Sequence, residues 1–164
     1  MQQTATTDIH ALATEAGQRL KELGLLLATT ESCTGGGVAE AITEIPGSSA
    51  WFDCGFVTYS NAAKMTLLQV PAKILEQHGA VSNETAAAMC QGGLRNSKAH
   101  VALSTTGIAG PDGGVPGKPV GTVCFGWAYG DKVKVEQKHF NGDRAAVRAQ
   151  SVEHALRGLL EILN

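Results

Sequence analysis

Apolar positions follow helical spacing in some segments and form continuous runs in others, and these patterns predict most of the elements. Residues 8–23 carry apolar side chains at helical intervals and stop at Gly24, a residue type that often ends helices. A continuous apolar run over residues 25–30 then predicts a buried strand. The remaining helices are expected over residues 36–43, 61–68, 72–78, 82–95 and 141–163, and the remaining strands over 51–59, 99–104, 121–129 and 132–140.

The order of these elements predicts an α/β fold. Strands interleaved with helices and followed by one hairpin, turned at Gly130 and Asp131, indicate a three-layer α/β/α domain with a mixed, mostly parallel sheet of about five strands. The length of 164 residues suits one domain with a substantial core, and we find no internal repeat or linker. We therefore expect a single domain over residues 1–164, with residues 1–7 flexible.

Composition excludes several classes of function. The formal charge of -2 gives no reason to expect binding to nucleic acid or to an anionic membrane. No apolar segment approaches the roughly 20 residues of a membrane span, and the N-terminus lacks the basic and apolar regions of a signal peptide, so a cytoplasmic protein is expected. The cysteines and histidines lack the spacing of a zinc site or of a disulfide framework. We therefore expect no metal site, and buried free thiols for most of the cysteines.

The sequence TESCTGGG at residues 30–37 joins the first predicted strand to a glycine-rich helix start. Ser32 and Thr34 fall in this turn, where the free N–H groups of a helix N-terminus face whatever lies beyond it. A nucleophile with anion-binding N–H groups beside it is one interpretation. The other is that Ser32 or Thr34 merely caps the helix, as these residue types often do.

A base for Ser32 is expected in the segment YSNAAK at residues 59–64, between the second predicted strand and the next helix. Adjacent parallel strands end at the same edge of a sheet, so this junction would lie beside Ser32. Lys64 must lose roughly 3 pKa units to be largely neutral near pH 7, and burial is able to supply such a shift. The Tyr59 hydroxyl is then placed to orient the amine or to relay its proton. Alternatively, Lys64 is a solvated helix lysine and Tyr59 a half-buried strand residue.

Residues 105–119 are rich in glycine and proline, which predicts a long loop of functional importance. The loop is not a phosphate-binding Walker motif, because Asp112 stands where its first glycine is needed and Pro119 where Ser or Thr is needed. Dinucleotide-binding and nucleophile-elbow motifs are absent as well.

Three separated segments resemble the CinA C-terminal domain family, whose characterised stand-alone members are nicotinamide mononucleotide deamidases (PncC-type amidohydrolases). They are ESCTGG at residues 31–36, VTYSNAAK at 57–64, and TGIAGPDGG with KPVGTV between 106 and 123. Weaker similarity continues through residues 80–82 and 140–144, so the resemblance extends over nearly the whole chain from about Leu12 onward. The family's frequent N-terminal partner domain is missing, which favours the free-standing form.

This resemblance implies an amidohydrolase that converts nicotinamide mononucleotide to nicotinate mononucleotide and ammonia in pyridine nucleotide salvage. Ser32 would attack the carboxamide carbon, with Lys64 as general base and Tyr59 assisting it. The backbone N–H groups expected to hold the oxyanion are those around Cys33, Thr34, Gly35 and Gly36. No cofactor is indicated, and a homodimer is expected from the resemblance.

The 5′-phosphate of such a substrate needs its own site. Backbone N–H groups of the third strand's end and a guanidinium at the start of the last helix are expected to supply it, from Thr106, Gly107, Gly110 and Arg144. Lys118 either contacts substrate or simply ends the loop.

Two other hypotheses remain open. The chain might be a non-catalytic nucleotide-binding or interaction module of the CinA type, or an amidase for another pyridine carboxamide or nucleotide. Loss of turnover with retained substrate binding in a Ser32→Ala variant would argue against the first, and a comparison of nicotinamide riboside with its phosphate would test the second.

Overall fold

The computed structural model describes residues 2–164, with side chains from residue 9 onward. The elements follow the order α1 (Gln2–Leu23), β1 (Leu27–Glu31), α2 (Gly37–Thr43), η1 (Ser48–Ala50), β2 (Phe52–Val57), α3 (Asn61–Leu68), α4 (Ala72–His78), α5 (Asn83–Arg95), β3 (Val101–Gly107), β4 (Thr122–Tyr129), β5 (Lys132–His139) and α6 (Arg144–Leu163). The first helix therefore begins earlier than the apolar pattern predicted. The expected flexibility of residues 1–7 stays a prediction, because residue 1 and the side chains of residues 2–8 lie outside the described part.

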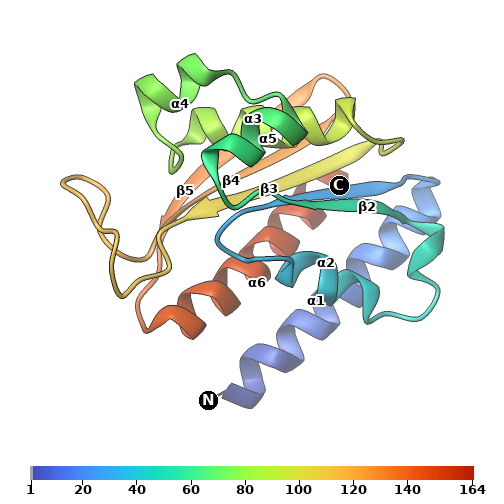
Figure 1. Cartoon of the computed structure of the whole chain (residues 1–164). Coiled ribbons are helices and arrows are strands. Elements are labelled where there is room, and N and C mark those ends of the chain that lie inside the picture. Colours follow the sequence, from blue (N-terminus) through green and yellow to red (C-terminus); the bar gives the residue numbers. More distant parts are fainter. Residues whose placement is uncertain (1) are drawn as a thin grey trace.

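The five strands found over residues 2–164 form one mixed sheet in the order β2-β1-β3-β4-β5. β1 pairs in parallel with both β2 and β3, whereas β3 with β4 and β4 with β5 are antiparallel. In this part of the chain, β4 is thus the one strand that runs against the other four. Helices α1, α2 and α6 cover one face and α3, α4 and α5 the other, which confirms the predicted three layers (Figure 1).

The core is built from the apolar stripes of the helices and from the buried strands between them. Leu20 of α1 and Leu156 and Leu159 of α6 are fully buried, and burial of such a side chain contributes about 1.5–3 kcal/mol. Close packing on this face also needs a small residue, because a Cβ atom at Gly158 would lie 2.0 Å from the ring of Trp127. The Trp127 indole N–H donates to the carbonyl of Ala155 at 3.0 Å, which fixes β4 against α6.

The helices that border the candidate site begin at side-chain caps. The hydroxyl of Ser60 accepts a hydrogen bond from the N–H of Ala63 at the start of α3, and Asp143 does the same for Ala146 at the start of α6. Such caps satisfy N–H groups that have no partner within the helix. They set the positions at which α3 and α6 leave the sheet edge.

The long loop begins later than predicted. Thr105, Thr106 and Gly107 belong to β3, opposite Phe125, Cys124 and Val123 of β4. The composition after residue 104, rich in threonine and glycine, is typical of a turn, so it did not predict this extension. In the structure, the backbone groups of these residues form hydrogen bonds with β4, which makes them part of the strand. Over residues 2–164, none of the helices combines the length and hydrophobicity needed to cross a membrane.

Candidate active site

Ser32 lies where the sequence placed it, directly after strand β1, which is flanked by β2 and β3, and before α2. Its backbone N–H donates to the carbonyl of Thr105 in β3 at 2.9 Å, and its side chain is buried, with 8% exposed. The chain then turns through Gly35 and Gly36, whose φ angles of +60° and +102° lie in the left-handed region that favours glycine. β3 and these two glycines therefore fix the position of Ser32.

Lys64 projects from the first turn of α3 toward Ser32. Its Nζ lies 3.0 Å from Oγ of Ser32 and donates to the carbonyl oxygens of Thr58 at 2.7 Å and Tyr59 at 3.1 Å. In the ammonium form, Nζ donates its third N–H bond to Oγ of Ser32. In the neutral form, which has two N–H bonds and one lone pair, donation to the two carbonyls would leave the lone pair facing the Ser32 hydroxyl. The predicted proximity of Ser32 and Lys64 is confirmed.

Burial changes the acid–base character of Lys64. The side chain is 1% exposed, and loss of hydration lowers its pKa to about 8. A pKa near 8 leaves about a tenth of the amine neutral at pH 7 and about half at pH 8. Lys64 therefore has the properties of a general base at moderately alkaline pH.

Tyr59 contacts Lys64 differently from what was predicted. Its carbonyl, not its hydroxyl, accepts the hydrogen bond from Lys64, while the hydroxyl accepts one from Nη2 of Arg144 at 3.0 Å. The ring is 61% exposed, because β2 has ended two residues earlier and the side chain faces the sheet edge. Tyr59 is thus placed beside the site rather than between Lys64 and Ser32.

Arg144 contacts the segments that follow both neighbours of β1, the one after β2 and the one after β3. Its Nη1 donates to the carbonyl of Gly110, in the loop after β3, at 2.8 Å, while Nη2 reaches Tyr59, which follows β2. Because β1 lies between β2 and β3, the guanidinium crosses the sheet edge at which Ser32 lies. The structure thus brings Arg144 and Gly110 together through the Gly110 carbonyl, and their contact with substrate stays a prediction.

Glu31 is a buried residue that sequence reasoning missed. One carboxylate oxygen accepts hydrogen bonds from the Thr34 hydroxyl at 2.6 Å and the N–H of Val38 at 2.8 Å, and the other from the N–H of Ala39 at 3.1 Å. Glu31 thereby caps α2 and closes the turn after Ser32. No local capping pattern predicts this, because the carboxylate lies seven and eight residues before the N–H groups it binds.

Replacing Glu31 by glutamine is expected to lower the free energy of unfolding by about 2–3 kcal/mol. The amide removes the charge from three hydrogen bonds and turns its NH₂ group toward a buried donor. Chemical denaturation measures the change, with Glu40→Gln as the matched control, since Glu40 is an exposed residue of the same helix. The control is expected to lose less than about 1 kcal/mol. Equal losses in both variants would contradict the capping role.

The turn after Ser32 offers specific backbone donors for an oxyanion. The N–H of Gly35 donates to the carbonyl of Ser32 at 3.0 Å and is therefore occupied, contrary to expectation. Within the described residues, the N–H groups of Cys33, Thr34 and Gly36 have no hydrogen-bond partner. The N–H groups of Cys33, Thr34 and Gly36 are therefore the remaining candidates for oxyanion donors.

Cys33 contributes its backbone rather than its thiol. The side chain is 5% exposed and packs in the main core, and burial raises its pKa to about 12. The thiol therefore stays protonated and is a poor nucleophile.

Two of the residues expected to bind phosphate have inward contacts. The Thr106 hydroxyl donates to the carbonyl of Ala80 at 2.7 Å, and a Cβ atom at Gly107 would lie 2.7 Å from Val123. Both follow from the extension of β3, which directs these residues into the packed sheet. Thr106 and Gly107 thus serve the packing of β3, and their contact with substrate stays a prediction.

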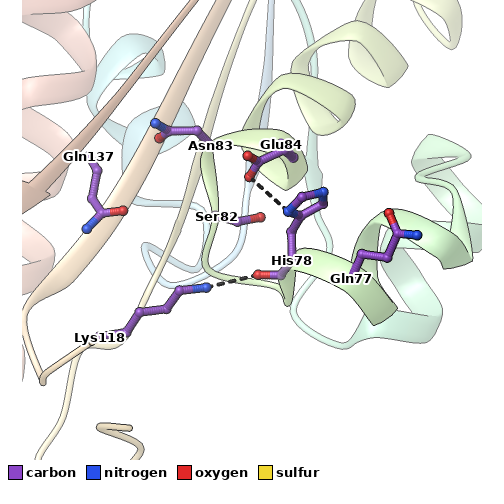
Figure 2. A pocket seen from close by; sticks show the side chains of 7 residues that line it. All are labelled: Gln77, His78, Ser82, Asn83, Glu84, Lys118 and Gln137. Carbon is purple, nitrogen blue, oxygen red and sulfur yellow. Dashed lines mark hydrogen bonds and ion pairs between the residues drawn. The ribbon is translucent and has the colours of Figure 1, made fainter. Parts of the chain in front are cut away.

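Lys118 lies in a separate polar cavity of about 360 Å³ at the N-terminus of α5 (Figure 2). The side chains drawn around it are those of Gln77, His78, Ser82, Asn83, Glu84, Lys118 and Gln137. Nζ of Lys118 donates to the carbonyl of His78, the last residue of α4, at 2.9 Å. Lys118 therefore anchors the long loop to α4, and a contact with substrate stays a prediction.

Comparison with known proteins gives consistent matches. A relative from Pseudomonas putida named nicotinamide-nucleotide amidohydrolase PncC is 53% identical over 94% of this chain and 96% of its own length. The protein of the same name from Escherichia coli K12 is 48% identical over 93% of each chain. The crystal structure of the competence/damage inducible protein CihA from Agrobacterium tumefaciens matches with a TM-score of 0.93 and 42% identity, covering 96% of both chains.

The family model for the CinA C-terminal domain matches residues 9–163, from within α1 to the end of α6. That match, with relatives of about half-identical sequence over almost the same length, shows that the chain belongs to the CinA C-terminal domain family.

Proposed function

We propose that this protein hydrolyses the carboxamide of nicotinamide mononucleotide to nicotinate mononucleotide and ammonia through a Ser–Lys acyl-enzyme mechanism. The observation that carries the proposal is the 3.0 Å contact between Lys64 Nζ and Ser32 Oγ, with the other two Nζ contacts made to carbonyl oxygens. The names of the relatives from Pseudomonas putida and Escherichia coli support the substrate.

In the acylation step, Lys64 takes the hydroxyl proton of Ser32 as Oγ forms a bond to the carboxamide carbon. Negative charge develops on the carboxamide oxygen, where the free N–H groups of Cys33, Thr34 and Gly36 are positioned to donate. Such donors typically contribute about 3 kcal/mol each. As the C–N bond breaks, the Lys64 ammonium returns its proton to the leaving nitrogen, and ammonia departs.

In the deacylation step, water attacks the ester carbon and gives a proton to Lys64. The ester bond then breaks, and Ser32 recovers its hydroxyl proton from the ammonium as nicotinate mononucleotide leaves. Tyr59 assists by holding Lys64 with its carbonyl and Arg144 with its hydroxyl. Arg144, with the backbone around Gly110, is the donor proposed for the 5′-phosphate.

The proposal also includes a metabolic role, a cellular location and an oligomeric state. We infer a role in pyridine nucleotide salvage, in the cytoplasm and as a homodimer, from the resemblance and from the names of the relatives. The binding partner we propose is the small-molecule substrate, without nucleic acid or membrane.

The test is ammonia release from nicotinamide mononucleotide by the purified protein. We expect ammonia and nicotinate mononucleotide in equal amounts, and a hydroxamate when hydroxylamine intercepts the acyl-enzyme. Substrate-induced thermal stabilisation without ammonia release would instead favour the binding-module hypothesis. Equal rates with nicotinamide riboside would favour an amidase for another pyridine carboxamide.

A further inference from the structure

Arg148 lies against the turn that follows Ser32, on α6 and one helical turn after Arg144. Its Nε donates to the carbonyl of Cys33 and its Nη2 to the carbonyl of Thr34, both at 3.2 Å. A Cβ atom added at Gly35 would lie 3.2 Å from the same Nη2, so glycine leaves room for the guanidinium. The sequence offered one signal for this residue, its spacing of four from Arg144, which places both on one helix face.

The two arginines form no ion pair with a carboxylate of the described residues. The buried Glu31 carboxylate accepts its hydrogen bonds from a hydroxyl and two backbone N–H groups, not from a guanidinium. Arg157, further along α6, differs: its Nη2 pairs with Glu153 at 2.7 Å. Like charges four residues apart repel each other, and an anion bound by both would relieve that repulsion.

The arginines approach the sheet edge from the side opposite Lys64. Arg144 and Arg148 belong to α6 and Lys64 to α3. These two helices cover opposite faces of the sheet (Figure 1). Between them lie Ser32 and the turn that follows it. A substrate whose carboxamide carbon reaches Ser32 would have its remaining groups along the edge where the two guanidinium groups lie.

We propose that Arg148 is a specificity-determining residue that binds the dianionic phosphate of the substrate together with Arg144. The proposal rests on the function proposed above and names the group that the enzyme selects. Arg148 uses two of its five N–H donors on the carbonyls of Cys33 and Thr34 and keeps the other three for phosphate oxygens.

The experiment compares ammonia release from nicotinamide mononucleotide and from nicotinamide riboside in four proteins. These are the parent, Arg148→Gln, Arg148→Lys, and Arg157→Gln as a control on the same helix. We expect Arg148→Gln to raise KM for the mononucleotide by about 10- to 100-fold, as for a lost charge-assisted hydrogen bond, and to change kcat less than threefold. The ratio of kcat/KM between the two substrates is expected to fall accordingly, to recover partly with lysine, and to stay unchanged in the control.

Other results overturn the proposal. An equal loss of kcat on both substrates would mean that Arg148 only positions the turn, and an unchanged substrate ratio would mean that it does not contact phosphate. If the parent releases no ammonia, the function proposed above fails while phosphate binding remains testable. In that case, inorganic phosphate must raise the melting temperature of the parent more than that of Arg148→Gln, or the phosphate site fails as well.

Discussion

Ser32→Ala is expected to lower kcat for nicotinamide mononucleotide by a factor on the order of 10⁵, with little change in folding or in substrate binding. Loss of a serine nucleophile that works as a unit with its base typically has an effect of this size. The backbone N–H of residue 32 would still donate to Thr105, and the variant removes one buried oxygen atom without disturbing β1 or α2. Steady-state ammonia release and thermal shift with substrate measure the two quantities.

Ser49→Ala is the matched control, because Ser49 is exposed and lies in η1, outside the candidate site. The control is expected to retain full turnover. A Ser32→Ala variant that still turns over at the parental rate would remove Ser32 from the mechanism. Retained thermal stabilisation by substrate, together with lost turnover, would separate an enzyme from a binding module.

The proximity of Ser32 and Lys64 could be predicted because it follows from topology rather than from side-chain detail. β1 and β2 are consecutive strands whose connection contains α2, and parallel pairing brings their carboxyl ends to one edge. Ser32 follows the first strand, and Lys64 lies in the first turn of the helix after the second. The strand predicted over residues 25–30 and the helix predicted over 61–68 agree with β1 and α3 to within a few residues.

The contacts of Tyr59, Thr106 and Arg148 could not be predicted in this way. Whether Tyr59 meets Lys64 through its hydroxyl or its carbonyl depends on the direction of the chain after β2, for which no periodic pattern exists. The inward contact of Thr106 arises because its strand continues into residues with a loop-like composition. Arg148 binds residues more than a hundred positions away, and only the packing of α6 against the first sheet face brings them together.

Lys64→Arg is expected to lower kcat by a factor of about 10²–10⁴, the range of a lost general base. Arginine keeps a positive charge and the ability to donate to the carbonyls of Thr58 and Tyr59. It cannot lose its proton in the accessible pH range, so it cannot accept one from Ser32. Lys73→Arg is the control, because Lys73 is an exposed residue of α4 and is expected to leave turnover unchanged.

The pH profile of the parent identifies the base more specifically than the loss of rate does. Burial lowers the pKa of Lys64 from 10.5 to about 8, so the neutral, proton-accepting form becomes populated as pH rises toward that value. kcat/KM is therefore expected to rise tenfold per pH unit below about pH 8 and to level off above it. Because Lys64→Arg lacks the lysine whose pKa lies near 8, its residual activity should lack this inflection. A parental profile that is flat between pH 6 and 9 would mean that another group accepts the proton, even if Lys64→Arg were inactive.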